Sequence, residues 1–233
     1  MSLNRLFFFQ VPSLSYSKKD LNDPSAQQRA IIGELATAVT NAVFLSHALR
    51  ENIGVYVYTT NPTPHLLYFT TNSIRYLGPQ ARSFASLVLK AQRVLADKCT
   101  QSLNPPSKPF SANPGLFISC THTPFTDIIA ELPASPKILY FQDSFATAFK
   151  KSNHKYFPST LKKFEEYFYD STSSSLPVIF PFLLPFNNPR QLKPRFSLEN
   201  HSHLSTTYLK LPKKYTFPQL ITVLNFLLDK KIT

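Results

Sequence analysis

The sequence predicts an α/β fold in which helices are layered on a mainly parallel sheet. Short apolar runs of strand composition alternate with longer segments that carry apolar residues at helical spacing. The clearest such segment is 30–50, where apolar residues recur every three or four positions. Hydrophobic residues make up 43% of the 233 residues, which is enough for one substantial core. We therefore expect a single layered domain.

Two long helices dominate the first half of the chain. Pro24 and Ser25 offer a helix start, so the first helix is expected to run from about 26 to 50. The second is expected over 79–97, with Phe84, Leu87, Val88, Ala91 and Leu95 turned inward. Strands are expected at 6–11, 53–59, 66–70 and 116–119. Polar or proline-rich loops and turns are expected at 13–23, 61–64, 73–77 and 102–114.

The second half continues the alternation of strands and helices. Strands are expected at 137–141, 177–180 and 206–211. Helices are expected at 125–132, 159–169 and 217–230. The proline-containing segment 182–198 is typical of a loop.

The charge of the chain favours a polyanionic partner. The formal net charge is +12 and the isoelectric point is near 9.7, which places nucleic acid ahead of an anionic membrane surface. A generally basic protein without such a partner is the alternative. No run approaches the roughly 18 apolar residues of a membrane helix, and the N-terminus lacks the layout of a signal peptide. We therefore expect no membrane partner.

The cysteines and histidines give weak signals. Two cysteines, Cys99 and Cys120, provide no disulfide framework and no CxxC motif, which favours the cytoplasm or another reducing compartment, an organelle included. The pairs Cys120/His122 and His201/His203 lack further ligands at usable spacing. We therefore expect no metal site.

Several segments together resemble one enzyme family. Residues 5–9 (RLFFF) resemble its opening strand, and 20–24 (DLNDP) resemble the acidic, proline-bearing loop before its first helix. Residues 44–50 (FLSHALR), with the strand that follows, resemble the end of that helix. Residues 220–230 (LITVLNFLLDK) are similar to its closing helix. The family is that of the archaeal-type tRNA pseudouridine-54 N1-methyltransferases, a branch of the SPOUT methyltransferase superfamily.

The resemblance implies a SPOUT-type fold with a C-terminal trefoil knot, and a homodimer formed through the knot region. It covers nearly the whole chain, with residues 144–175 as a divergent basic insertion in one domain spanning 1–233. In this family, S-adenosylmethionine lies bent in the knot and is held largely by backbone groups of three loops. Glycines recur there, because backbone can approach a ligand closely only where side chains are absent.

The knot half of this chain departs from that pattern. All four glycines lie at or before residue 115, and Pro181 and Phe182 occupy the central cofactor loop. Proline removes an N–H that could bond the cofactor, and phenylalanine adds bulk. The positions that match the family's cofactor pocket, which we expect to be degenerate, are Phe141, Gln142, Phe180, Pro181, Phe182, Ser205 and Leu220. We therefore expect no cofactor; an active enzyme would use S-adenosylmethionine.

The substrate side of the resemblance is also altered. The family's first helix opens with an arginine and a carboxylate that suit the target nucleotide, and the nearest residues here are Arg29 and Glu34. Both lie one or two places out of register, and one helix position is about 100° of rotation. They are weak candidates for catalytic residues.

Basic residues interleaved with aromatics gather in the second half of the chain. This pattern suits a groove that follows a nucleic-acid backbone and stacks bases, although a solvated basic face over core aromatics is equally compatible with it. The candidate RNA-binding residues are Lys150, Lys151, Lys155, Arg190, Lys193, Arg195, Lys213 and Lys214.

Three functions fit these observations. The first is an RNA-binding protein on a SPOUT scaffold that no longer methylates and serves as a structural or assembly factor in an RNA–protein particle, with tRNA or rRNA as partner. The second is an active S-adenosylmethionine-dependent tRNA pseudouridine-54 N1-methyltransferase. The third is a protein-binding partner of an active relative, which leaves the net charge of +12 unexplained.

Overall fold

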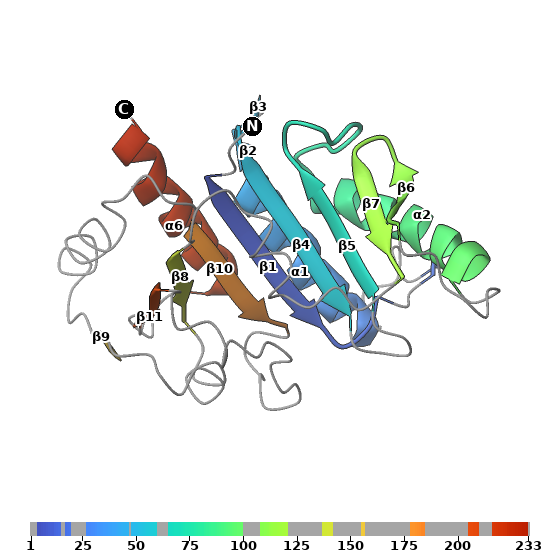
Figure 1. Ribbon diagram of the computed structural model, residues 1–233, viewed down its shortest axis with the longest axis horizontal. Coiled ribbons are helices and arrows are strands. Elements are labelled where there is room, and N and C mark those ends of the chain that lie inside the picture. The colour runs from blue at the N-terminus through green and yellow to red at the C-terminus, as the bar shows by residue number, and fades with distance from the viewer. Residues whose placement is uncertain are drawn as a thin grey trace.

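A computed structural model describes eleven stretches of the chain, namely residues 4–14, 17–19, 27–46, 48–59, 65–99, 108–120, 137–141, 155–156, 178–184, 205–209 and 216–232. These stretches form a nine-stranded sheet with the strand order β6-β7-β5-β4-β1-β10-β8-β11-β9 (Figure 1). The strands are β1 (Arg5–Val11), β4 (Ile53–Thr59), β5 (His65–Thr70), β6 (Phe110–Asn113), β7 (Leu116–Ser119), β8 (Lys137–Tyr140), β9 (Lys155–Tyr156), β10 (Val178–Leu183) and β11 (Ser205–Leu209). A separate hairpin joins β2 (Phe44–Leu45) to β3 (Ala48–Leu49).

Most of the sheet is parallel. Strand β1 lies at its centre and pairs in parallel with β4 on one side and β10 on the other. Strands β10, β8, β11 and β9 continue in parallel, whereas β5, β7 and β6 are antiparallel to their neighbours. The expectation of an α/β fold with a mainly parallel sheet is confirmed at this level.

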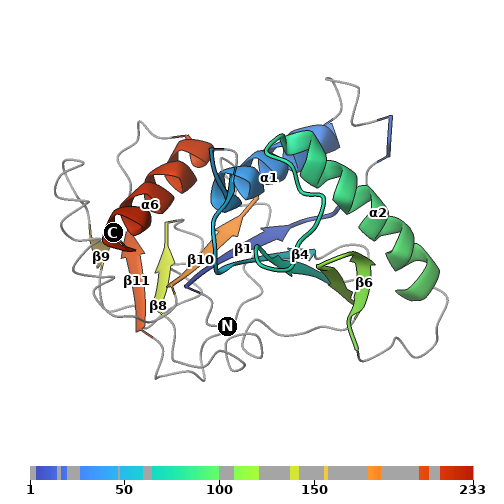
Figure 2. The ribbon, with the colours of Figure 1, turned by 90° about the horizontal axis from the view of Figure 1, so that it is seen from above.

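Three described helices cover one face of the sheet. They are α1 (Gln27–Val43), α2 (Ala81–Cys99) and α6 (Phe217–Ile232), and Figure 2 shows all three on the same side. Helix α1 lies between α2 and α6 and contacts both. On β1, Phe7, Phe9 and Val11 belong to the core beneath these helices, as alternation along a strand requires.

The intervening positions of the strands point to the opposite face. There Phe8 stacks on Tyr56, Tyr56 on Tyr68, and Tyr68 on Phe117, with ring centroids 5.5–6.3 Å apart. The row crosses β1, β4, β5 and β7, because the strand register places these residues side by side. Stacked cross-strand aromatic pairs add to the stability of neighbouring strands.

The first helix is shorter than expected. The sequence predicted a helix over 26–50, but α1 ends at Val43 and the chain turns back through the β2–β3 hairpin. The amide of Arg50 donates to the carbonyl of Val43 at 2.8 Å, and Ser46 has a positive φ of 58°. The apolar period that predicted a longer helix continues through Leu45. It was misleading there, because Leu45 is 56% exposed and does not belong to the buried face of the helix.

The strand expected at 177–180 is longer than predicted. It extends to Leu183, so Pro181 and Phe182 lie on β10 rather than on a loop. The amides of Val178 and Leu184 donate to carbonyls beside β1, which turns the amide position of Pro181 toward β8. The described pairing with β8 ends at Ile179, so the missing N–H of Pro181 interrupts no described ladder bond.

The segment 102–114 was expected to be a loop, but its end, Phe110–Asn113, forms β6 at the edge of the sheet. The pairing with β7 is irregular between Ser111 and Asn113, and such bulged edge strands carry weak sequence signals. The helices expected at 125–132 and 159–169 lie outside the described residues. The basic insertion contributes β9, which pairs with β11.

Cys99 and Cys120 correct another expectation. No disulfide was expected from the sequence, whereas these residues are disulfide-bonded with their Cα atoms 5.6 Å apart. Cys99 ends α2 and Cys120 directly follows β7, and α2 packs beside the neighbouring strand β6. Their sequence separation of 21 residues gave no sign of this proximity.

Candidate functional site

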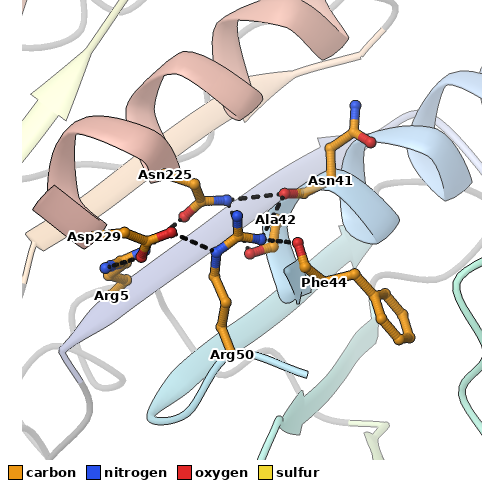
Figure 3. Close-up of polar contacts among 7 residues, drawn as sticks. All are labelled: Arg5, Asn41, Ala42, Phe44, Arg50, Asn225 and Asp229. Atoms are coloured by element: carbon orange, nitrogen blue, oxygen red, sulfur yellow. Dashed lines mark hydrogen bonds and ion pairs between the residues drawn. The ribbon is translucent and has the colours of Figure 1, made fainter. Parts of the chain in front are cut away.

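A buried polar cluster joins the first strand, the segment after α1 and the last helix (Figure 3). We call it the arginine–aspartate cluster; its members are Arg5, Arg50, Asn225 and Asp229. Arg5 Nη2 lies 2.6 Å from Asp229 Oδ1, and Arg50 Nε lies 3.0 Å from Asp229 Oδ2. Arg5 Nη1 also donates to Asn225 Oδ1 at 2.9 Å. Each carboxylate oxygen of Asp229 therefore forms an ion pair with a different arginine.

The fold places these side chains by simple periodicity. Arg5 begins β1 and shares the helix-facing side of the strand with Phe7 and Phe9. Asn225 and Asp229 are four residues apart on α6 and so lie on one face of that helix. Arg50 reaches them because the β2–β3 hairpin returns the chain toward the end of α1.

The cluster also satisfies the carboxyl end of α1. Asn225 Nδ2 donates to the carbonyls of Asn41 and Ala42, each at 2.9 Å. The guanidinium of Arg50 donates to the carbonyls of Asn41 and Phe44. The last carbonyls of a helix lack partners within it and attract positive charge, so these contacts close the helix end.

The charges of the cluster do not balance. Two guanidinium groups face one carboxylate, which leaves one positive charge in excess, and Arg5 is only 4% exposed. Burial lowers the pKa of Arg5, the hydrogen bond and charge of Asp229 oppose that shift, and the charge of Arg50 adds to it. Guanidinium groups nevertheless stay protonated near neutral pH. The cluster is therefore suited to fixing chain segments rather than to proton transfer.

A second cluster, made of phenylalanine rings, fills the space between α6 and the central parallel strands. We call it the phenylalanine cluster, and every member is at most 7% exposed. Its members are Phe7, Phe9, Phe141, Phe180, Phe182 and Phe217. The centroids of Phe182 and Phe217 lie 5.0 Å apart, edge to face, so the start of α6 packs against β10.

Four of the predicted cofactor residues lie in or beside this core. Phe141 stacks with both Phe180 and Phe182, with centroids 6.4 and 6.2 Å apart. Leu220, one turn into α6, is 1% exposed and belongs to the same core. These four side chains are therefore part of the packed core, and their role as a degenerate cofactor pocket stays a prediction.

The remaining predicted cofactor residues are less informative. Pro181 is on β10, facing away from the helices at the position paired with Phe8. Ser205 is the first residue of β11, where the backbone alone is described. Gln142 lies outside the described residues.

The two catalytic candidates both lie on α1. Arg29 and Glu34 are five residues apart, which is about 140° around the helix axis. Glu34 is half-buried, whereas for Arg29 the backbone alone is described. Their catalytic role stays a prediction.

The candidate RNA-binding residues fall almost entirely outside the described stretches. Lys155 lies on β9, at the edge of the sheet, where the backbone alone is described. The others outside the described residues are Lys150, Lys151, Arg190, Lys193, Arg195, Lys213 and Lys214. They remain predictions.

Sequence reasoning missed the arginine–aspartate cluster, although a signal was present. Asn225 interrupts an apolar run, and Arg5 and Asp229 lie directly beside apolar runs; polar residues at a buried face need partners. The sequence could not show that Arg50 would be that partner. Comparison with known proteins adds nothing, since no protein family and no curated protein matches the sequence.

Two further properties concern the described residues. Among them, no helix combines the length and apolar character needed to cross a membrane. Nor do the described stretches gather three or more histidine, cysteine, aspartate or glutamate side chains in an arrangement that could hold a metal ion.

Proposed function

We propose that this chain is a divergent SPOUT protein related to the archaeal-type tRNA pseudouridine-54 N1-methyltransferases. The arginine–aspartate cluster supports the proposal. Three of the segments that resemble the family contribute to it. Arg5 comes from residues 5–9, Arg50 from 44–50, and Asn225 with Asp229 from 220–230. A shared fold would require these segments to lie close together, and the cluster is compatible with that requirement.

The proposal includes a trefoil knot near α6 and a homodimer formed through that region. The contact of Phe217 with Phe182 is compatible with the knot, because the last helix lies against the carboxyl end of β10. The parallel order of β1, β10, β8 and β11 is compatible with such a fold. Light scattering of the purified chain would test the dimer.

The proposed activity is RNA binding without methyl transfer, as a structural or assembly factor in an RNA–protein particle. The phenylalanine cluster is the observation that carries the loss of methyl transfer. Phe141, Phe180 and Phe182 match positions where the family holds its cofactor, and here they are packed in the core. The net charge of +12 supports the RNA partner, either tRNA or rRNA.

The expected loss of cofactor affinity is large. Each buried polar group of a ligand that finds no partner costs about 1–3 kcal/mol. Two or three such losses lower the affinity on the order of 10²- to 10⁴-fold. Steric overlap with the rings would add to this.

Two measurements on the intact chain test the proposal. Calorimetric titration with S-adenosylmethionine should give no binding heat, and a filter-binding assay with tRNA and rRNA fragments should give salt-sensitive binding. Low micromolar affinity for S-adenosylmethionine, or methyl transfer to a pseudouridine-containing tRNA arm, would instead establish the active methyltransferase. Absence of RNA binding would contradict both.

A further inference from the structure

The turn before α2 and the solvent face of that helix form a basic surface in the first half of the chain. From residue 75 to residue 99 the cations are Arg75, Arg82, Lys90, Arg93 and Lys98, all exposed, and the single carboxylate is Asp97. Helix α2 lies at the outer edge of the helical layer, beyond α1 and away from α6 (Figure 2). None of these residues is among the RNA-binding residues expected from the sequence.

Three of these cations share one stripe of the helix. At 100° and 1.5 Å per residue, Arg82, Lys90 and Arg93 fall within an arc of about 80° and span about 16 Å along the axis. Asp97 lies on the same arc, in the last turn of α2. Between the start of the helix and Asp97, the charged residues on this arc are all positive. We call these three residues the α2 stripe.

An exposed aromatic residue lies in the turn that precedes α2 and its stripe. Tyr76 is 78% exposed and has a φ of 63°, in the left-handed region that non-glycine residues rarely adopt. Asparagine or glycine would occupy this position with less strain. The strained backbone of Tyr76 costs free energy, and because the side chain is exposed, burial of the ring does not offset that cost.

The backbone around Tyr76 is fixed on both sides. The carbonyl of Tyr76 accepts a hydrogen bond from Ser83 Oγ at 3.3 Å, and the same hydroxyl accepts one from the amide of Gly78 at 2.8 Å. Before Tyr76, the amide of Arg75 donates to the carbonyl of Pro114 at 3.0 Å. The ring is thus presented from a turn anchored to the first turn of α2 and to the β6–β7 hairpin.

We propose that Tyr76 and the α2 stripe form a binding site for single-stranded RNA, in which a base stacks on Tyr76 and the phosphates that follow run along the stripe. The proposal rests on the proposed RNA-binding function and assigns it a surface. Charge complementarity selects a polyanion, and the exposed ring selects a strand whose bases are unpaired. Because the backbone that carries the ring is anchored, binding does not have to order that turn.

The stacking part is tested with variants of Tyr76 that keep the turn. Tyr76→Asn removes the ring but suits a positive φ, while Tyr76→Phe keeps the ring and serves as the matched control. Affinity for a labelled single-stranded oligonucleotide of about ten nucleotides should fall about 5- to 150-fold for Tyr76→Asn. It should stay within about twofold for Tyr76→Phe. Unchanged affinity of a folded Tyr76→Asn variant would overturn the stacking role.

The stripe is tested by charge reversal of all three cations to glutamate. The slope of log affinity against log salt should become shallower by about 2, because each lost phosphate contact removes about 0.7 for a single strand. The matched control, Arg82→Lys with Lys90→Arg and Arg93→Lys, keeps every charge and should keep the slope. If the reversed variant melts like the parent and keeps the parent's slope, the stripe is not the site.

The two proposals fail in different ways. If the parent protein binds RNA and the variants at Tyr76 and at the α2 stripe bind it equally well, the proposed function stands and this surface is overturned. Parent protein that binds neither single-stranded RNA nor tRNA and rRNA fragments at low salt would overturn both.

Discussion

The guanidinium of Arg5, at the start of the first strand, lies 2.6 Å from the carboxylate of Asp229, near the end of the last helix. Arg5 is buried, whereas the side chain of Asp229 is 30% exposed, so the pair lies at the border of the core. Arg50 holds the second carboxylate oxygen. One aspartate thus ties the two ends of the described chain to the turn that follows α1.

Asp229→Asn should strongly destabilise the protein. Removal of the carboxylate leaves the buried Arg5 without its counter-charge, and breaking a buried ion pair in this way costs about 3–5 kcal/mol. We expect about 3 kcal/mol, at the lower end, because solvent reaches part of Asp229. Urea denaturation would measure the loss.

Asp97→Asn is the control for that substitution. Asp97 is exposed on α2, and surface substitutions of this kind change stability by about 0.5 kcal/mol or less. Equal midpoints for Asp229→Asn and Asp97→Asn would contradict a stabilising role for the arginine–aspartate cluster.

Phe182→Ala should lower the free energy of unfolding by about 3–5 kcal/mol, since it leaves a cavity among packed rings. Phe226→Ala on α6 is the matched change at a side chain that is 53% exposed, and it should cost much less. Thermal melting of both variants would check this. The cavity alone should not create affinity for S-adenosylmethionine, because it supplies no polar partners; measurable binding to Phe182→Ala would refute that view.

Two glycines should respond to alanine in opposite directions. Gly33 lies inside α1, and apart from its chain neighbours and the backbone of its own helix no atom lies within 4 Å of the position that an added methyl group would take. Gly33→Ala should therefore stabilise the protein by about 0.5–1 kcal/mol. Gly115 has a φ of 79°, and a Cβ there would collide with the backbone of Ser73, so Gly115→Ala should cost at least about 2 kcal/mol. Chemical denaturation of the two variants would measure the change in the free energy of unfolding for each. A Gly115→Ala variant as stable as the parent would contradict the described turn.

The Cys99–Cys120 disulfide should contribute about 3 kcal/mol, as expected from the chain entropy of a loop with 21 residues of separation. Dithiothreitol should therefore lower the urea midpoint of the parent protein. The double variant Cys99→Ser with Cys120→Ser should begin at the lower midpoint and be insensitive to reductant. A parent midpoint that ignores reductant would show that the bond does not contribute.

Reversal of Lys150, Lys151 and Lys155 to glutamate should weaken RNA binding across sequences. For single strands the slope of log affinity against log salt should become shallower by about 2, because three phosphate contacts are lost. Electrophoretic mobility shifts over a salt series would measure it. RNA affinity that is equal at low and physiological salt would refute the basic-groove hypothesis altogether.

Local patterns were sufficient for most of the described elements. The apolar run of β1, the strand composition of β4 and the period of α2 each depend on neighbours within a few residues, and all three were predicted nearly to their ends. Pro181 shows the limit. Proline normally argues against a strand, and it is tolerated here because its amide position faces the side where pairing with β8 has ended.

Composition and periodicity were sufficient to predict an α/β fold, and they gave the strongly basic charge and the absence of glycine after residue 115. Three features could be seen only in the folded chain: α1 ends at Val43, Cys99 is bonded to Cys120, and Arg5 and Arg50 share Asp229. The two groups differ in how far along the sequence the interacting residues lie. Periodicity and composition report on contacts within a turn or a strand, whereas the partner of a buried charge is set by which distant segments the completed sheet and helices bring together.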